Sequence, residues 1–189
     1  MPTHRSTPAL RTVLLAALTA CLAACSSRPS GALPNAEPLE SVSDFDTERY
    51  LGLWYEISKY PVSFEEGLVG VTAEYSVRKD GKLKVLNGGF KGTLGGKRSE
   101  STGKAWAPDP EHPERLKVQF FWPFKGDYWV IDLDPDYRWA VVGEPKRRYL
   151  WILSRTPTLP PATYDSIVER ITGHGYDVNR LERMEQPGS

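Results

Sequence analysis

Side chains that could act as nucleophiles, general bases or metal ligands are few in this chain of 189 residues. Beyond residue 25 the only histidines are His112 and His174, and each adjoins a proline or a glycine in an expected loop. Neither has a nucleophile or a charge partner close by in the sequence, as a catalytic base would need. We therefore expect no enzymatic activity.

A short acidic repeat is the nearest approach to a metal site. Asp132, Asp134 and Asp136 alternate as at the start of a calcium loop. However, Tyr137 stands where such a loop needs glycine, and Gly143 stands where it needs the closing glutamate. The segment therefore reads as a hairpin turn, and no metal is expected.

The charge balance and a glycine-rich stretch exclude two further kinds of site. The chain has 24 Lys and Arg against 24 Asp and Glu, too even for a protein that binds nucleic acid through bulk positive charge. Residues 88–96 are rich in glycine but lead into Arg98 and a predicted strand, not into the helix that follows a phosphate-binding loop. We expect neither a nucleic-acid partner nor a cofactor.

The two cysteines lie in an export signal. Cys21 and Cys25 are too early in the chain and too close together to staple a core. Residues 1–12 carry basic side chains and no acid, and residues 13–24 form an almost unbroken run of apolar or small residues. This run is shorter than the ~20 residues that cross a bilayer, so it is typical of a secretory signal.

The end of this run resembles the lipobox of bacterial lipoproteins. In Leu22-Ala23-Ala24-Cys25, small residues precede a cysteine that would be lipidated and become the first residue of the mature protein. Leu18-Thr19-Ala20-Cys21 also fits a lipobox but leaves a shorter apolar core. Ordinary cleavage without lipidation is a further alternative. We favour Cys25 as the lipidation site and residues 1–24 as the lipoprotein signal peptide.

The residues after Cys25 predict the destination and a spacer. Ser26 stands where an aspartate would retain such a lipoprotein in the inner membrane, so the resemblance implies a lipid anchor in the cell outer membrane, facing the periplasm. Residues 25–45 contain Pro29, Pro34 and Pro38, several serines and no apolar periodicity. This composition predicts a flexible tether.

Short segments of strand character fill most of the remaining chain. In residues 71–77 the apolar residues take every second place, and turn residues such as those in 79–82 and 134–136 separate the segments. Connections this short make sequence neighbours into spatial neighbours, which favours an up-and-down barrel or a sandwich. The predicted strands are 53–60, 69–78, 82–89, 98–106, 115–121, 127–133, 138–143 and 149–155.

One amphipathic helix follows the strands. Tyr164, Ile167, Val168 and Ile171 stand at helical spacing after two prolines, and the pattern stops at Gly173. A short final strand is expected within 178–184. This order is unusual for a sandwich and suits a barrel with a helix packed outside.

Three motifs resemble those of the lipocalin family. Gly52-Leu53-Trp54-Tyr55 resembles the motif that opens the first lipocalin strand, Asp136-Tyr137 lies between the sixth and seventh strands, and Arg155 ends the eighth. Segments 149–157 and 120–124 resemble bacterial lipocalin lipoproteins and their apolipoprotein D-like relatives. The resemblance covers residues 46–186. It implies an all-β fold, an eight-stranded antiparallel up-and-down barrel with one C-terminal α-helix outside and a short final strand.

The motif residues have a structural role that can be stated without the family. Trp54 on the first strand can plug the narrow end of a barrel. The Arg155 guanidinium can stack on its indole while donating to nearby carbonyls. We expect Gly52, Trp54, Tyr55, Asp136, Tyr137 and Arg155 to be structural and not ligand contacts.

The inward faces of the predicted strands define a candidate cavity. An eight-stranded barrel has room for its own side chains or for one small ligand, and the sequence leaves both alternatives open. The sixth and seventh strands are apolar on both faces, so a helix, a partner or a membrane must cover their outer faces. The inward residues that we expect to contact ligand are Val71, Ala73, Tyr75, Val85, Val118 and Phe120.

Single-chain lipids fit such a cavity. A buried C16 chain gains on the order of 12 kcal/mol at ~0.8 kcal/mol per methylene, before the cost of ordering the chain is subtracted. We expect a fatty acid or lysophospholipid ligand and a lipocalin that stores or transports it for membrane maintenance. A structural or interaction lipoprotein with a filled barrel and a small lipid-modifying enzyme are the alternatives. Exposed apolar faces are also compatible with a homodimer.

Overall fold

The computed structural model describes Leu33 and residues 36–189. The predicted signal peptide (1–24) and the predicted lipidation site, Cys25, lie outside the described residues. Within the described part of the chain, no helix is both long enough and apolar enough to cross a membrane.

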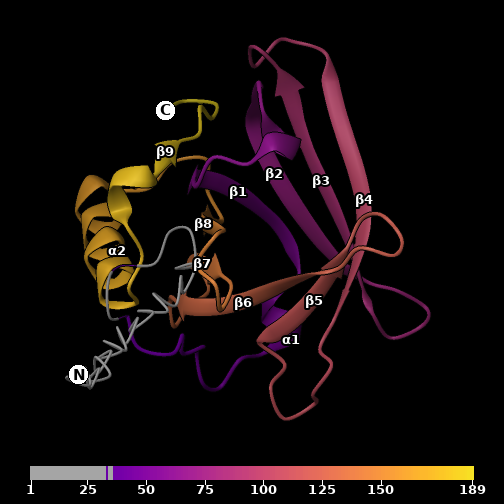
Figure 1. Ribbon diagram of the computed structural model, residues 1–189. Helices are drawn as coiled ribbons and strands as arrows, with labels where there is room; N and C mark the ends of the chain where they lie inside the picture. The colour runs from indigo at the N-terminus through magenta and orange to yellow at the C-terminus, as the bar shows by residue number, and fades with distance from the viewer. Residues whose placement is uncertain (1–32, 34–35) are drawn as a thin grey trace, which may run out of the picture.

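Eight antiparallel strands form a closed barrel (Figure 1). Each strand pairs with its neighbours in sequence, and β1 closes the barrel by pairing with both β2 and β8. This confirms the predicted up-and-down barrel. The strands are β1 (Gly52–Lys59), β2 (Leu68–Val77), β3 (Leu83–Lys91), β4 (Arg98–Trp106), β5 (Arg115–Gln119), β6 (Gly126–Leu133), β7 (Trp139–Gly143) and β8 (Leu150–Ser154).

Alternation along the strands sends one set of side chains into the barrel. On β2, Tyr75 joins the buried interior cluster and Ala73 packs against it, whereas Glu74 between them is exposed. The buried members of this interior cluster are Tyr50, Trp54, Tyr75, Leu83, Val85, Ala105, Leu116, Tyr128, Val130, Tyr137, Ala140, Val142 and Leu153.

The wall of the barrel is uneven. Strand β5 pairs with only three residues of β4, 104–106, although β4 pairs with β3 over residues 98–105. The β3–β4 hairpin therefore extends well beyond the β5–β6 connection at one end of the barrel, while α1 (Thr47–Tyr50) lies at the other end (Figure 1). We call the end with α1 the closed end and the opposite end the mouth.

Helix α2 (Pro161–Gly173) covers the outer faces of the strands that are apolar on both sides. Its residues Tyr164, Ile167 and Ile171 pack with Ile131 of β6 and Val141 of β7 in a second buried cluster. The helix begins at Pro161, which suits a first-turn position because proline lacks the amide hydrogen that would be unpaired there. In Figure 1 the helix lies on the side of the barrel away from β3 and β4.

The chain after α2 is only partly a strand. Val178–Arg180 forms a 3-10 turn (η2) because the Asp177 side chain accepts a hydrogen bond from the Asn179 amide. Strand β9 is limited to Glu182–Arg183, which pairs with Ser58 and Lys59 on the outside of β1. The final strand is therefore present but shorter than the expected 178–184 range.

Two short elements, α1 and a 3-10 turn, are too short to show a periodic pattern of apolar residues in the sequence. Asp46 caps α1 by accepting hydrogen bonds from the Glu48 and Arg49 amides. A 3-10 turn, η1 (Ser63–Glu65), lies in the β1–β2 connection. The two elements lie at opposite ends of the barrel, α1 at the closed end and η1 at the mouth.

The end of the predicted tether packs against the barrel. The Val42 amide donates to the Val130 carbonyl, the Ser41 hydroxyl donates to Glu114, and Leu39 is buried in the cluster beneath α2. Residues 39–42 thus pack against the barrel, ahead of the expected start of the folded body at residue 46. A tether over residues 25–45 as a whole stays a prediction.

Candidate functional site

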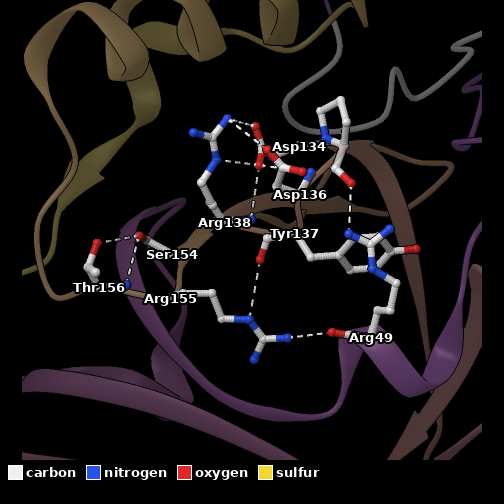
Figure 2. Close-up of polar contacts among 9 residues, drawn as sticks. Arg49, Asp134, Asp136, Tyr137, Arg138, Ser154, Arg155 and Thr156 are labelled. Carbon is white, nitrogen blue, oxygen red and sulfur yellow. Dashed lines mark hydrogen bonds and ion pairs between the residues drawn. The ribbon is translucent and has the colours of Figure 1, made fainter.

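Trp54 and Arg155 plug the closed end of the barrel. Trp54 is fully buried, and its indole nitrogen donates to the Tyr50 carbonyl over 2.8 Å. The Arg155 guanidinium carbon lies 3.7 Å from the centre of the Trp54 ring, a cation–π geometry. Its nitrogens donate to the carbonyls of Leu53, Arg49 and Tyr137. Figure 2 shows Arg155 between Arg49 and Tyr137.

Gly52 allows the chain to enter β1 beneath this guanidinium. Its φ of +89° lies in the region that side-chain-bearing residues rarely adopt. Tyr55, the last residue of the first motif, points outward, where it packs against the cluster beneath α2 and lines an outer groove. The first motif therefore contributes one interior plug and one outward contact.

The β6–β7 turn is held by Asp134 more than by Asp136. Asp134 is buried and accepts hydrogen bonds from the Asp136 amide and from the Arg138 amide and side chain. The hydrogen bonds from Arg138 lower the pKa of Asp134. Asp136 is exposed, with its carboxylate 3.7 Å from Arg138 (Figure 2). Sequence reasoning missed Asp134 as a site residue, although it was visible as the residue that opens the turn.

Tyr137 and Arg49 complete the closed end. Tyr137 is buried with a φ of 58°, and its hydroxyl accepts a hydrogen bond from the Asp46 amide. The Arg49 guanidinium lies 4.2 Å from the centre of the Tyr137 ring (Figure 2). These contacts tie α1 to the β6–β7 turn.

Three tyrosine hydroxyls meet inside the barrel above the plug. The Tyr128 hydroxyl lies 2.7 Å from the hydroxyls of both Tyr50 and Tyr75, and all three side chains are buried. Burial raises the pKa of each phenol. The three groups therefore stay neutral and give the interior a polar region that the sequence analysis did not anticipate.

An acid pair and a lysine lie inside the barrel toward the mouth. Glu56 of β1 and Glu65 of η1 are buried, and Lys59 places its ammonium 3.8 Å from Glu65 Oε2. Burial raises the pKa of Glu56, and the negative charge of Glu65 raises it further. Burial also raises the pKa of Glu65, whereas Lys59 and hydrogen bonding with Glu56 and Trp151 oppose that rise. Burial of two neighbouring carboxyl groups therefore raises the pKa of both above the usual value.

The predicted cavity residues all lie on β2, β3 or the β5 region. Tyr75 and Val85 belong to the buried interior cluster, and Ala73, Val118 and Phe120 pack against it while staying partly exposed. Val71 is buried and stands outside the main cluster, with its carbonyl bound by the Gln186 side chain. Contact of these six residues with a ligand stays a prediction.

Exposed aromatic side chains lie on two of the connections at the mouth. Phe121, Trp122 and Phe124 of the β5–β6 connection are 73%, 86% and 76% exposed, and Phe64 of η1 is 63% exposed. A hollow of about 340 Å³ lies beside this connection and is lined in part by Gly103, Phe120 and Trp122. We call these four exposed aromatic side chains the apolar rim.

Comparison with known proteins agrees with this architecture. Residues 45–186 match the model of a lipocalin-like domain. The chain is 44% identical over 180 residues to outer membrane lipoprotein Blc of Escherichia coli (strain K12), covering 93% of this chain and 97% of the relative. It is 33% identical over 152 residues to apolipoprotein D of Mus musculus, covering 76% and 78%.

A solved structure shares the fold. Insecticyanin from the tobacco hornworm Manduca sexta superposes with a TM-score of 0.61 at 24% identity, covering 82% of this chain and 86% of that one. The barrel, the outer helix, the three motifs in order and the match over residues 45–186 lead to one conclusion. The chain belongs to the lipocalin family.

Proposed function

We propose that this chain is an outer-membrane lipoprotein whose barrel binds fatty acids or lysophospholipids and stores or transports them for membrane maintenance. The name of the Escherichia coli relative, outer membrane lipoprotein, supports this location. Members of the lipocalin family are generally binding proteins and not enzymes, which supports binding over catalysis.

One observation carries the proposal, the contrast between the plugged end and the interior above it. Trp54 and Arg155 seal the closed end, whereas Ala73 and Val118 face inward and stay partly exposed. A cup with one closed end accepts a single acyl chain along its axis. The exposed aromatic side chains at the mouth are suited to contact the chain as it enters or leaves.

The proposal is tested on the chain that begins at Ser26. Every described contact lies within Leu33 and residues 36–189, so this form keeps all of them and lacks only the predicted signal and Cys25. Native mass spectrometry should detect one single-chain lipid retained after purification. Added lysophospholipid should quench tryptophan fluorescence saturably. No bound lipid together with no saturable quenching would overturn the proposal and favour a filled barrel.

The anchor is tested separately in cells that produce the full chain. We expect Cys25→Ala to abolish metabolic labelling with palmitate and to release the protein from the outer-membrane fraction. Cys21→Ala is the matched control and should leave both unchanged. Palmitate labelling that survives in Cys25→Ala would show that the lipidated cysteine has been assigned wrongly.

A further inference from the structure

A buried set of charges toward the mouth contains two acids and one base. Glu56 and Lys59 of β1 and Glu65 of η1 are 4%, 6% and 7% exposed. The Lys59 ammonium lies 3.8 Å from Glu65 Oε2, and the carboxyl groups of Glu65 and Glu56 are hydrogen-bonded to each other. A hydrogen bond between two carboxyl groups requires a proton on one of them. The set is therefore neutral while the two acids share one proton.

A register shift brings the acid and the lysine of β1 to the same face. Glu56 pairs with Leu153, and Lys59 pairs with Trp151 after a shift between Glu56 and Ser58. Leu153 belongs to the interior cluster and Trp151 packs against it. Because residues three apart on a regular strand point to opposite faces, the shift is what lets both charged side chains of β1 face the interior.

Residues 61–66 of the β1–β2 connection span two fixed points. Before this segment, the Tyr60 amide donates to the Leu150 carbonyl of β8. After it, the Gly92 amide donates to the Gly67 carbonyl. A segment held at both ends can open locally while the strands on either side stay paired.

The Glu65 side chain links this segment to the strands. The backbone hydrogen bonds of η1 stay within the segment, as from the Glu65 amide to the Val62 carbonyl. The Glu65 carboxyl, in contrast, is hydrogen-bonded to Glu56 and Trp151 and lies beside Lys59. Val62 is buried as well, so the segment is attached through apolar packing and through this carboxyl.

Loss of the shared proton breaks the polar part of this attachment. Two carboxylates beside one ammonium leave one negative charge unbalanced, and buried like charges repel strongly. Tyr75 of β2 also faces the pair: burial raises its pKa, and the charges of Glu56 and Glu65 raise it further, so it stays neutral and supplies no balancing charge. Movement of Glu65 into water relieves the repulsion without unfolding β1.

We propose that Glu65 is a proton-dependent latch at the mouth: while it shares a proton with Glu56 beside Lys59 it holds residues 61–66 against the strands, and loss of the proton releases them. The latch itself needs no ligand. Its consequence rests on the proposed function, because release of a segment at the mouth speeds the exchange of a bound lipid. The barrel then retains lipid longer at acid pH than at alkaline pH.

The direction of the pH dependence follows from the two states. In the released state a solvated carboxyl returns toward the usual pKa of 4.5, whereas the latched state raises the pKa of both carboxyls above it. The latched state therefore loses its advantage as the pH rises from about 4.5 through the latched pKa. Each pH unit in this window favours release by up to about tenfold.

Hydrogen–deuterium exchange tests the latch without a ligand, on the chain that begins at Ser26 (the Ser26 form). Protection of the Glu65 and Glu66 amides, corrected for the intrinsic pH dependence of exchange, is measured at pH 5 and pH 9. We expect it to fall by about tenfold or more, because a three-residue turn does not persist once detached. At pH 9 the amides of β7 should remain far better protected, as local opening requires.

Two substitutions should fix the latch in opposite states. Glu56→Gln keeps a hydrogen-bond donor toward Glu65 at every pH and leaves one carboxylate beside one ammonium, so protection should stay high at pH 9. Glu65→Ala removes the carboxyl, so protection should be low at both pH values. Glu66→Gln is the matched control, since it removes an exposed carboxyl from the same connection, and it should keep the pH dependence.

Lipid release measures the consequence for exchange. Lysophosphatidylcholine is the probe because its own charge is the same at pH 5 and pH 9, and stopped-flow tryptophan fluorescence gives its dissociation rate. We expect this rate to rise about tenfold between the two pH values in the unmodified protein and in Glu66→Gln. In Glu56→Gln the two rates should agree within about twofold.

Each outcome decides one part of the inference. Segment protection that is equal at pH 5 and pH 9 in the unmodified protein, or that still falls in Glu56→Gln, would overturn the latch. Exchange in the segment that only follows that of β7 would also overturn it, because the whole barrel would then be unfolding. A pH-dependent segment with a pH-independent lipid release would refute the role in exchange. If no lysophosphatidylcholine binds, the proposed function fails, and the ligand-free exchange experiment still decides the latch.

Discussion

The two ends of the barrel satisfy their polar groups in opposite ways. At the closed end, the Arg155 guanidinium donates to three backbone carbonyls, and Asp134 accepts from the Asp136 amide and from Arg138. Toward the mouth, Glu56 and Glu65 lie buried as an acid pair beside Lys59, and aromatic side chains are exposed. The closed end thus neutralises its buried charges with backbone carbonyls and a salt bridge, whereas the mouth combines a buried acid pair with exposed aromatic rings.

The comparison also separates stability from binding. Buried, paired groups contribute most to the free energy of unfolding, whereas exposed rings and unpaired acceptors contribute little or subtract from it. We therefore expect substitutions at the closed end to lower stability with little change in lipid preference. Substitutions toward the mouth should change lipid binding, while the free energy of unfolding stays nearly the same or rises.

Trp54→Ala should have the largest effect on stability. Removing a fully buried indole leaves a cavity and an unpaired Tyr50 carbonyl, and we expect the free energy of unfolding to fall by about 3–5 kcal/mol. Urea unfolding of the Ser26 form measures it. A loss below about 1 kcal/mol, with lipid binding abolished, would show that Trp54 contacts ligand and does not plug the barrel.

Arg155→Met should come next. Methionine keeps an apolar stem over Trp54 but leaves the carbonyls of Leu53 and Arg49 without their charged donor, so we expect a loss of about 2 kcal/mol. Arg155→Lys should recover only part of it, because one ammonium cannot span carbonyls on different segments. Urea unfolding measures both variants. If lysine restored the full free energy of unfolding, the positive charge of Arg155 alone, and not its geometry, would stabilise the closed end.

Glu56→Gln should change stability in the opposite direction. Burial raises the pKa of Glu56 above its usual 4.5 in the folded protein, so the folded state keeps a proton that the unfolded chain releases. The free energy of unfolding therefore falls as the pH rises above about 4.5 and up through the folded pKa. Gln cannot ionise, and we expect it to stabilise the protein by about 1 kcal/mol at pH 8.

The same variant supplies its own control at low pH. Below pH 4 both states of the unmodified protein hold the proton, so the gain from Glu56→Gln should vanish. Urea unfolding at pH 4 and pH 8 measures both values. A gain that is equal at the two pH values would rule out a proton held by Glu56.

The apolar rim should give the smallest effect. Phe121→Ser and Trp122→Ser alter side chains that are mostly exposed, and each should change the free energy of unfolding by no more than about 0.5 kcal/mol. Thermal or urea unfolding would show this directly. A loss near that of Trp54→Ala would mean that the mouth is packed like the closed end.

Much of the fold could be predicted from the sequence because local signals agree there. Alternation on β2, the turn residues at 79–82 and the helical spacing of Tyr164 and Ile167 each act over a few residues. Strands that are apolar on both faces predicted a cover over β6 and β7, and α2 is that cover; the sequence left a helix, a partner and a membrane as alternatives. The short α1 and η1 could not be predicted, because three or four residues are too few to show a helical spacing of apolar side chains.

The polar interior was missed, and only part of it could have been predicted from the sequence. Alternation from Trp54 already turns Glu56 inward, a signal that was present in the sequence. Lys59 faces inward only because of a register shift on β1, and Glu65 lies in a 3-10 turn between strands, where strand alternation cannot predict its direction. These placements depend on the closed barrel and have no local signature.

The most direct test of a lipid-binding interior is to fill it. Ala73 faces inward and is partly exposed, and Glu74→Phe on the outer face is the matched control. If the interior is a cavity, Ala73→Phe will abolish lysophospholipid binding with a loss of stability below about 1 kcal/mol, and Glu74→Phe will leave binding unchanged. If the barrel is filled by its own side chains, Ala73→Phe will overpack it and cost about 1–3 kcal/mol or more, with no lipid binding to lose in the unmodified protein.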